Sequence, residues 1–468
     1  MEMRDIRDLL TGRKNEPAPR APMAPTVPLA AEPPSPQAGV TPAVEAYAKL
    51  KNKLHQEILK KVDLASLEDM SEHRLRQEIA ALVGHMLAET PAQINELERR
   101  MLVRDIQNEM LGLGPLELLM ADPTISDILV NSYSQVYVER KGVLELTNVT
   151  FSDDKHLLRI IDKIVSRIGR RIDESSPMVD ARLPDGSRVN AVIPPIALDG
   201  PMLSIRRFAV TPLTMPDLVN TYKSLTPDMA LLLEGLAKSK TNLLISGGTG
   251  SGKTTLLNIL SGYIPETERI ITIEDAAELQ LQQPHVIRLE TRPPNIEGKG
   301  EINQRALVRN ALRMRPDRIV IGEVRGAEAI DMMQAMNTGH EGSLTTIHAN
   351  NPRDALSRLE NMISMAGFNL PHRASRQQIA AAITVIVQEN RLTDGHRKVT
   401  SIQEITGMEG EIVTMQEIFG YRQTGIDEHG KVLGYFQATG VRPKFAERLR
   451  SQGIALPDAM FDPTKHYE

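Results

Sequence analysis

Residues 247–254 read GGTGSGKT, and this stretch decides the fold because it matches G-x-x-x-x-G-K-[ST] at every fixed position. Residues 242–246 before it form a short apolar run typical of a buried strand, and residues 254–263 after it have a helical pattern. The backbone N–H groups of a glycine-rich loop between a strand and a helix can bind a phosphate, and the positive end of the helix dipole strengthens this binding. The alternative, a β–α turn that binds nothing, is disfavoured by the strand and helix on either side.

Each polar side chain of the loop has an expected role. Lys253 neutralises the β- and γ-phosphate oxygens, the Thr254 hydroxyl contributes to a Mg²⁺ site, and Thr255 lies toward the α-phosphate. ATP and Mg²⁺ are therefore the predicted cofactors. The predicted nucleotide-binding residues are Gly248, Thr249, Gly250, Ser251, Gly252, Lys253, Thr254 and Thr255.

Beyond Asp228, short apolar runs alternate with amphipathic helical patterns. This alternation predicts an α/β domain with a mostly parallel sheet that is covered on both faces. Residues 383–436 instead favour antiparallel strands, with a turn at Thr393-Asp394-Gly395.

Three further strands of this domain end in groups suited to hydrolysis. RIITIED at 269–275 ends in Glu274 and Asp275, either of which can activate a water molecule, although Asp275 can also cap a helix. RIVIGE at 318–323 ends in Glu323, a candidate second contact to Mg²⁺ of the Walker B type. SLTTIH at 343–348 ends in His348 and follows His340, and we expect both histidines to sense the γ-phosphate rather than to be purely structural.

Arginines recur in two places. Arg309 and Arg313 lie four residues apart on one predicted helix, in a stretch with six arginines and two acids, 305–325. Like charges on one helix face repel each other, and a phosphate on a neighbouring subunit would explain their placement. Earlier in the chain, four arginines fall on predicted strands and are candidates for trans-acting contacts to a γ-phosphate or for ordinary ion pairs. These four are Arg182, Arg188, Arg206 and Arg207.

The rest of the chain divides by composition. Residues 1–42 include nine prolines between 17 and 42 and predict a disordered tail. Residues 43–114 predict a three-helix bundle whose third helix starts at a Thr90-Pro91 cap. Residues 115–210 predict a small α+β domain with a hairpin turn at Pro184-Asp185-Gly186. A linker at 211–227 leads into the nucleotide domain at 228–468.

Composition excludes several classes of protein. The 468 residues contain no cysteine, which excludes disulfides and thiolate zinc sites. No segment approaches the roughly 18 apolar residues of a membrane span, and the N-terminus has no secretory h-region, so we expect a cytoplasmic protein. A net charge of −5 and 3% aromatic residues disfavour direct nucleic-acid binding.

Four boxes then occur in a fixed order within about 110 residues: GGTGSGKTT, IEDAAEL, RPDRIVIGEVRG and TGHEGSLTTIHAN. In this order they resemble the Walker A, Asp box, Walker B and His box of the type II/IV secretion ATPases, over roughly residues 44–440. RLETRPPNIEGKGEI and ILVNSYSQVYVERKG resemble the CpaF/TadA group, which powers Tad (tight adherence) pili. The chain departs from the general secretion and type IV pilus assembly ATPases because it lacks their tetracysteine zinc module.

The resemblance implies a RecA-like motor domain behind a small PAS-like α+β domain, assembled as a homohexamer with nucleotide between the two domains. It implies that Glu274 is the catalytic base, that Glu323 supports Mg²⁺, and that His340 and His348 belong to the γ-phosphate sensor. It implies nucleotide contacts, on a looser alignment, for Arg188, Arg206, Arg309 and Arg313.

The implied work is the assembly of a pilus through an inner-membrane platform protein, from the cytoplasmic face of that membrane, and the resemblance leaves open whether the motor also retracts the pilus. The tail and helical bundle would contact a regulatory or pole-localising partner. Three alternatives stay open: a type IV secretion or conjugation ATPase, an archaeal filament motor, and a nucleotide-switched scaffold with little turnover.

Overall fold

The computed structural model describes residues 42–61, 71–89, 94–140, 142–207, 212–292, 294, 299–367 and 370–467. The expected disordered tail up to residue 41 and the expected Thr90-Pro91 cap lie outside the described residues. The described chain forms two compact units, one up to Ile106 and one from Gln107 onward.

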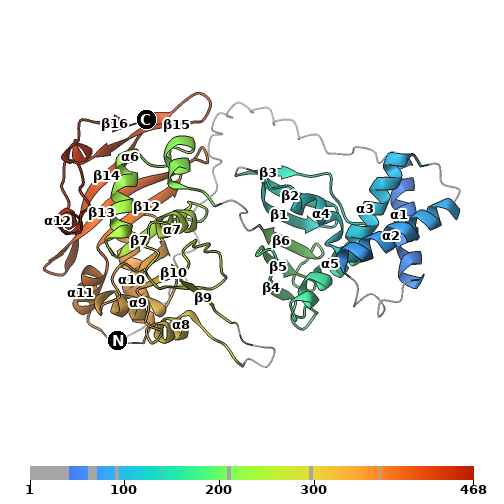
Figure 1. The fold of residues 1–468 in the computed structure, drawn as a ribbon, viewed down its shortest axis with the longest axis horizontal. Helices are drawn as coiled ribbons and strands as arrows, with labels where there is room; N and C mark the ends of the chain where they lie inside the picture. Colours follow the sequence, from blue (N-terminus) through green and yellow to red (C-terminus); the bar gives the residue numbers. More distant parts are fainter. Residues whose placement is uncertain are drawn as a thin grey trace, which may run out of the picture. The chain divides into compact units, whose positions relative to one another are not determined.

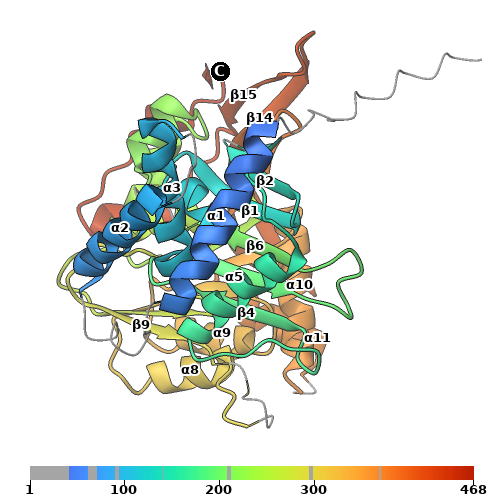
Figure 2. The same cartoon turned by 90° about the vertical axis from the view of Figure 1, so that its right-hand side faces the viewer.

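The first unit is built from helices, drawn in blue in Figures 1 and 2. They are α1 (Pro42–Lys61), α2 (Glu72–Glu89) and α3 (Glu96–Leu111), the last of which continues into the second unit. α3 begins with a capping box, in which the Glu98 N–H donates to Asn95 Oδ1 and the Asn95 N–H donates to Glu98 Oε2, both at 2.8 Å. The buried apolar residues of this unit are Leu54, Ile58, Ile79, Val83, Met86, Leu87, Leu102 and Ile106.

The second unit begins with a six-stranded antiparallel sheet of order β3-β2-β1-β6-β5-β4. Its strands are β1 (Ile125–Ser132), β2 (Gln135–Arg140), β3 (Val143–Leu146), β4 (Met178–Arg182), β5 (Arg188–Val192) and β6 (Met202–Arg206). The turn η3 (Gly114–Leu116), helix α4 (Glu117–Met120) and helix α5 (Asp154–Arg167) pack against it. Asp153 caps α5 by accepting the His156 N–H at 2.7 Å, and the apolar residues of α5 recur every three or four positions toward the sheet.

The remainder forms a ten-stranded sheet of order β16-β15-β14-β13-β12-β7-β11-β10-β8-β9. Its parallel part contains β7 (Leu243–Gly247), β8 (Ile270–Glu274), β9 (Val286–Glu290), β10 (Arg318–Val324), β11 (Leu344–His348) and β12 (Val385–Arg391). Its antiparallel part contains β13 (Arg397–Glu409), β14 (Ile412–Ile426), β15 (Val432–Ala438) and β16 (His466–Tyr467). The α/β prediction is confirmed, and β11 separates the GGTGSGKT strand β7 from the Glu323 strand β10.

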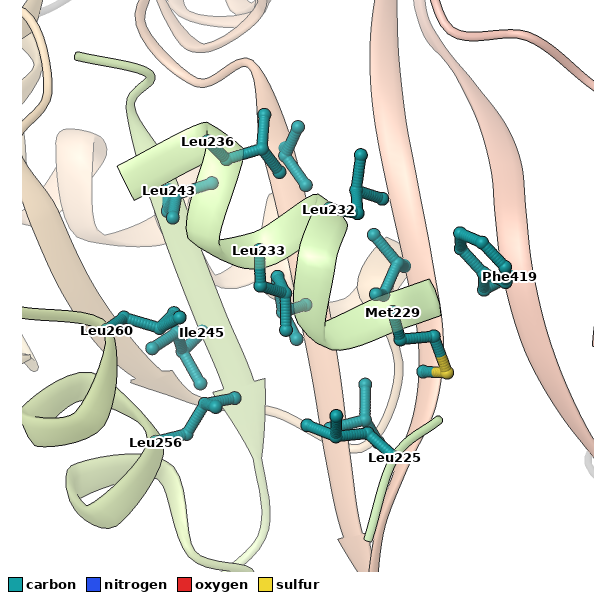
Figure 3. Packing of buried hydrophobic residues seen from close by; sticks show 14 of the residues in the cluster. Leu225, Met229, Leu232, Leu233, Leu236, Leu243, Ile245, Leu256, Leu260 and Phe419 are labelled. Carbon is teal, nitrogen blue, oxygen red and sulfur yellow. The ribbon is translucent and has the colours of Figure 1, made fainter. Parts of the chain in front are cut away.

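Helices cover both faces of this sheet. They are α6 (Pro227–Lys238), α7 (Lys253–Ser261), α8 (Gln304–Ala311), α9 (Glu328–Asn337), α10 (Pro352–Met365), α11 (His372–Ala382) and α12 (Phe445–Ser451), with the short turn η5 (Asp458–Phe461). Successive residues of β7 divide between two core clusters: Leu243 and Ile245 pack with α6, α7 and α12, whereas Leu244 packs with α8 to α11. Because side chains alternate along a strand, these clusters lie on opposite faces of the sheet. Figure 3 shows α6 packed over Leu243 and Ile245.

Residues 212–226 belong to the segment that the sequence predicts to be a linker. They contribute to the core cluster that contains Leu243, Ile245 and helix α6. They include a π-helical turn, η4 (Asp217–Thr221), and bury Met215, Leu218 and Leu225. Among the described helices, none combines the length and the apolar character that crossing a bilayer requires.

Candidate functional site

The GGTGSGKT loop leaves the carboxyl end of the fully buried strand β7 and enters α7 at Lys253. Gly250 and Gly252 have φ of 68° and 113°, a backbone conformation that favours glycine. A Cβ on Gly252 would collide with the Glu389 carboxyl, whereas a Cβ on Gly248 would meet nothing within 4 Å. The loop is thus fixed on one side by β12 and has open space at Gly248, as a phosphate cradle requires.

Lys253 is held inside this loop. Its Nζ donates hydrogen bonds to the carbonyl oxygens of Gly247 at 3.0 Å and Gly248 at 2.8 Å. Burial lowers the pKa of Lys253, and the nearby carboxylates of Glu323 and Glu389 act in the opposite direction. The ammonium therefore occupies the cradle where it can pass from backbone carbonyls to phosphate oxygens.

The three predicted strand ends reach the same edge of the sheet as the loop, because β8, β10 and β11 run parallel to β7. His348 lies opposite Gly247 in the pairing of β11 with β7. Burial and the Lys253 ammonium lower the pKa of His348, so its imidazole is held neutral. A neutral imidazole can donate one hydrogen bond to a phosphate oxygen and accept another.

Glu274 and Asp275 differ in their surroundings. Glu274 is buried, and its Oε2 accepts the N–H groups of Glu278 at 2.6 Å and Leu279 at 2.8 Å. Its Oε1 is buried with no partner among the described residues. Burial raises the pKa of Glu274 and the two N–H bonds oppose that shift. Asp275 is more exposed and pairs with Arg325 at 3.6 Å, so Glu274 has the better surroundings for a general base.

Glu323 is half-buried and pairs with Arg325 at 2.7 Å. Among the described residues, no group of three or more histidines, aspartates and glutamates forms a metal cage. Mg²⁺ is commonly held by one or two protein ligands together with phosphates and water, and the Thr254 hydroxyl and the Glu323 carboxylate are oxygen ligands of the kind that would hold it. When bound, the ion neutralises charge on the phosphates.

A cavity of about 270 Å³ opens beside the start of α7. Arg188 on β5, Arg206 on β6 and Arg207 just after β6 line one side, and Thr254 and Thr255 line it from α7. Further lining residues are Gly186, Pro212, Leu213, Asn258, Glu278 and Gln280.

The arginines of this cavity are held by carboxylates or carbonyls of the same chain. Arg188 pairs with Glu278 at 2.7 Å, and Arg206 pairs with Asp127 at 3.1 Å. Arg207 lies just after β6 and donates to the Ile125 carbonyl at 3.2 Å. The structure therefore brings Arg188 and Arg206 to the side of the loop where Thr254 and Thr255 lie.

Arg309 and Arg313 do not form the pair that the sequence predicts. α8 ends at Ala311, so Arg313 follows the helix instead of lying on it. Asp331 accepts hydrogen bonds from Arg305 at 2.7 Å and Arg309 at 2.9 Å. Arg309 thus has an acidic partner within the same chain, and the contact of Arg309 and Arg313 with a phosphate on a neighbouring subunit stays a prediction.

His340 is also separated from the loop. It precedes β11, whose carboxyl end reaches Gly247, so the five residues of the strand lie between His340 and the phosphate edge. At a rise of 3.2–3.4 Å per residue this is roughly 16 Å. His340 Nδ1 is buried without a partner in the described chain, and its membership of a γ-phosphate sensor with His348 stays a prediction.

Sequence reasoning missed three charged residues of the hairpin that β12 and β13 form beside β7. Glu389 lies against Gly252, and Arg397 Nε donates to the Gly250 carbonyl at 2.8 Å. Arg391 lies near Gly250 and donates to the Gly142 carbonyl at 3.0 Å. The only local signal was the turn at residues 393–395, because nothing in the sequence shows that β12 is the neighbour of β7.

Comparison with known proteins gives the family. The model of the family described as "Type II/IV secretion system protein" matches residues 109–432. A putative conjugal transfer protein of Mycobacterium tuberculosis is 39% identical over 318 residues, which cover 66% of this chain and 89% of that protein. The conjugal transfer protein TrbB of Rhizobium radiobacter is 32% identical over 334 residues, covering 70% of this chain and 97% of that protein.

The type IV secretion system protein VirB11 of Bartonella quintana is 30% identical over 328 residues, covering 62% of this chain and 91% of that protein. The family match spans the six-stranded sheet, strands β7 to β14 of the ten-stranded sheet and every element of the phosphate site. The chain therefore belongs to the type II/IV secretion system protein family and is a P-loop ATPase of that family.

Proposed function

We propose that this ATPase works as a cytoplasmic homohexamer that hydrolyses MgATP to assemble, and in reverse to retract, a Tad pilus through an inner-membrane platform protein. One observation supports the motor function. Because β7, β8, β10 and β11 are parallel, the phosphate loop and the buried carboxyl of Glu274 lie at the same edge of the sheet. The groups at this edge are Lys253, Glu274, Glu323 and His348. The assignment to Tad pili rests on the sequence segments at residues 128–142 and 288–302 and on the absence of cysteine.

The arrangement of the arginines supports the role of the antiparallel sheet in the nucleotide cycle. Arg188 and Arg206 line the cavity beside Thr254 and Thr255, so a nucleotide in the loop would contact both sheets of the second unit. Hydrolysis would then change the charge between the two sheets and alter their spacing, which is the movement a motor needs. In a hexamer, Arg309 and Arg313 would act on the site of a neighbouring chain.

A second candidate is a type IV secretion or conjugation ATPase, favoured by the names of the relatives from Mycobacterium, Rhizobium and Bartonella. The two functions are separated in the source organism with a Lys253→Ala chromosomal variant. The Tad proposal predicts that electron microscopy finds no surface pili, while DNA transfer to a recipient strain is unchanged. Normal pili with lost DNA transfer would favour the second candidate.

The hexamer has a separate test. Light scattering of the purified full chain with saturating MgATP is expected to give six copies per particle. A monomer under these conditions would contradict the proposed action of Arg309 and Arg313 across a subunit boundary. The tail and helical unit are proposed to bind a regulatory or pole-localising partner, and deletion of residues 1–41 is expected to leave hydrolysis intact while it changes the position of the motor in the cell.

A further inference from the structure

Glu389 is a buried carboxyl seated against the phosphate loop. It lies on β12, which pairs in parallel with β7 so that Glu389 stands opposite Gly247. Only 3% of its surface is exposed. Its Oε1 occupies the space into which a Cβ on Gly252 would project. The Glu389 carboxyl is therefore held against Gly252, the residue that precedes Lys253 in the loop.

The hydrogen bonding of this carboxyl is incomplete. Oε2 of Glu389 is buried and has no partner in the part of the chain that the structure describes. Buried polar atoms almost always have a partner in folded proteins. Glu404, a buried acid on the neighbouring strand β13, follows this rule, since its two oxygens accept the N–H groups of Lys444 and Phe445, both at 3.0 Å. The burial of Glu404 is thus explained by its two backbone hydrogen bonds, whereas the burial of Glu389 has no such explanation.

The charged groups that face Glu389 come from two elements. Lys253 on α7 and Arg397 on β13 both stabilise its ionised form, while burial opposes ionisation more strongly. The net result raises the pKa of Glu389 to about 8. Glu323 and Arg325 from the β10 edge act on Lys253 as well. At pH 7 the carboxyl is therefore already mostly protonated. Above pH 8, where much of it is ionised, a further negative charge beside it favours the uptake of a proton.

Lys253 has two competing classes of acceptor. In this structure it donates to the carbonyls of Gly247 and Gly248, and the Glu389 carboxylate attracts it electrostatically. Phosphates that enter the cradle place several negative charges beside the same carboxylate, and like charges at short range disfavour joint ionisation.

We propose that Glu389 is a positioning residue of the phosphate site, which takes up one proton from solvent when nucleotide phosphates bind and so leaves Lys253 free to pair with them. The proton adds to Glu389 Oε2, which then has a donor to offer to the loop, and Lys253 keeps its own three protons. This inference rests on the proposed nucleotide site at residues 247–255.

The test measures the affinity of the purified full chain for MgADP by titration calorimetry between pH 7 and pH 9. If binding requires protonated Glu389, a pKa of about 8 predicts that affinity falls about tenfold across this range. At pH 8.5 the observed heat should also depend on the ionisation enthalpy of the buffer, in the direction of proton uptake. Glu389→Gln keeps the shape of the side chain but cannot titrate, so it should lose most of both effects.

Glu404→Gln is the matched control, because Glu404 is a buried acid of the same sheet. It pairs with Val385 in the β12–β13 register, four residues from Glu389, or roughly 13 Å along the strand. This variant should keep the tenfold fall and the proton uptake of the parent chain. Any pH dependence that survives in Glu389→Gln belongs to other groups of the site.

The outcomes separate the two levels of the proposal. Failure of the parent chain to bind MgADP at pH 7 would contradict the nucleotide site itself. Binding with the same pH dependence in the parent and Glu389→Gln would overturn only the role of Glu389. If Glu389→Gln does not fold, the parent decides alone, because an absence of proton uptake at pH 8.5 overturns the inference.

Discussion

Replacement of Glu274 by glutamine separates catalysis from binding in this site. Glu274 Oε2 accepts two backbone N–H groups, from Glu278 and Leu279, and Oε1 is the oxygen that remains to accept a proton from water. A glutamine oxygen can keep both N–H bonds, but its NH₂ group cannot act as a base. Loss of a general base lowers the rate by roughly 10²–10⁴-fold, which corresponds to about 3–5 kcal/mol at 1.36 kcal/mol per factor of ten.

The structural cost of the same change is smaller. Two hydrogen bonds change from a charged to a neutral acceptor, and each loses on the order of 1 kcal/mol, so the variant should fold and bind nucleotide. The assay is steady-state phosphate release together with MgADP affinity. Asp275→Asn is the matched control, because Asp275 is the adjacent, more exposed carboxylate that pairs with Arg325. Its rate should stay near that of the parent.

Two results would refute this reasoning. Hydrolysis by Glu274→Gln at the rate of the parent chain would exclude Glu274 as the base. A large loss of nucleotide affinity in the same variant would show that the carboxylate acts mainly by holding the N–H groups of Glu278 and Leu279.

Three further outcomes are expected. Burial raises the pKa of Glu274, and a general base must be ionised, so kcat should fall as pH decreases through a pKa above that of a free glutamate. A pH–rate profile without this decrease at acidic pH would contradict the assignment of Glu274 as the base. Arg318 is fully buried and pairs with Glu268 at 2.6 Å, so Glu268→Ala should lower the free energy of unfolding in urea by roughly 3–5 kcal/mol. Gly252→Ala should destabilise the nucleotide-free chain by at least about 1–2 kcal/mol because of its positive φ and the Glu389 carboxyl, whereas Gly248→Ala should melt like the parent.

The sequence predicts the phosphate edge well for a simple geometric reason. Parallel strands deliver their carboxyl ends to one edge of a sheet, so strands that end in Glu274, Glu323 and His348 meet the loop after β7 whatever their exact order. The sequence also predicts the glycines of the loop, because a positive φ and the close approach of other groups to the loop backbone require residues without a Cβ. These properties depend on local pattern alone.

The parts that were missed depend on contacts between distant segments. The pairing of β12 with β7 joins residues about 140 positions apart, and this alone brings Glu389 and Arg397 to the loop. The sequence also does not show that His348, at the end of β11, lies beside the loop whereas His340 precedes the strand, because spacing in sequence does not show which end of a strand faces the site. The sequence likewise does not show the pairing of Arg309 with Asp331, because Asp331 lies on the next helix.

The most direct test of the central claim is phosphate release by the purified full chain with MgATP, measured beside Lys253→Ala. The account predicts Mg²⁺-dependent hydrolysis by the parent chain and its loss in the variant, because Lys253 is the ammonium held inside the cradle. A melting curve of the nucleotide-free variant close to that of the parent would show that the loss is chemical. Undiminished hydrolysis by a folded Lys253→Ala protein would contradict the account.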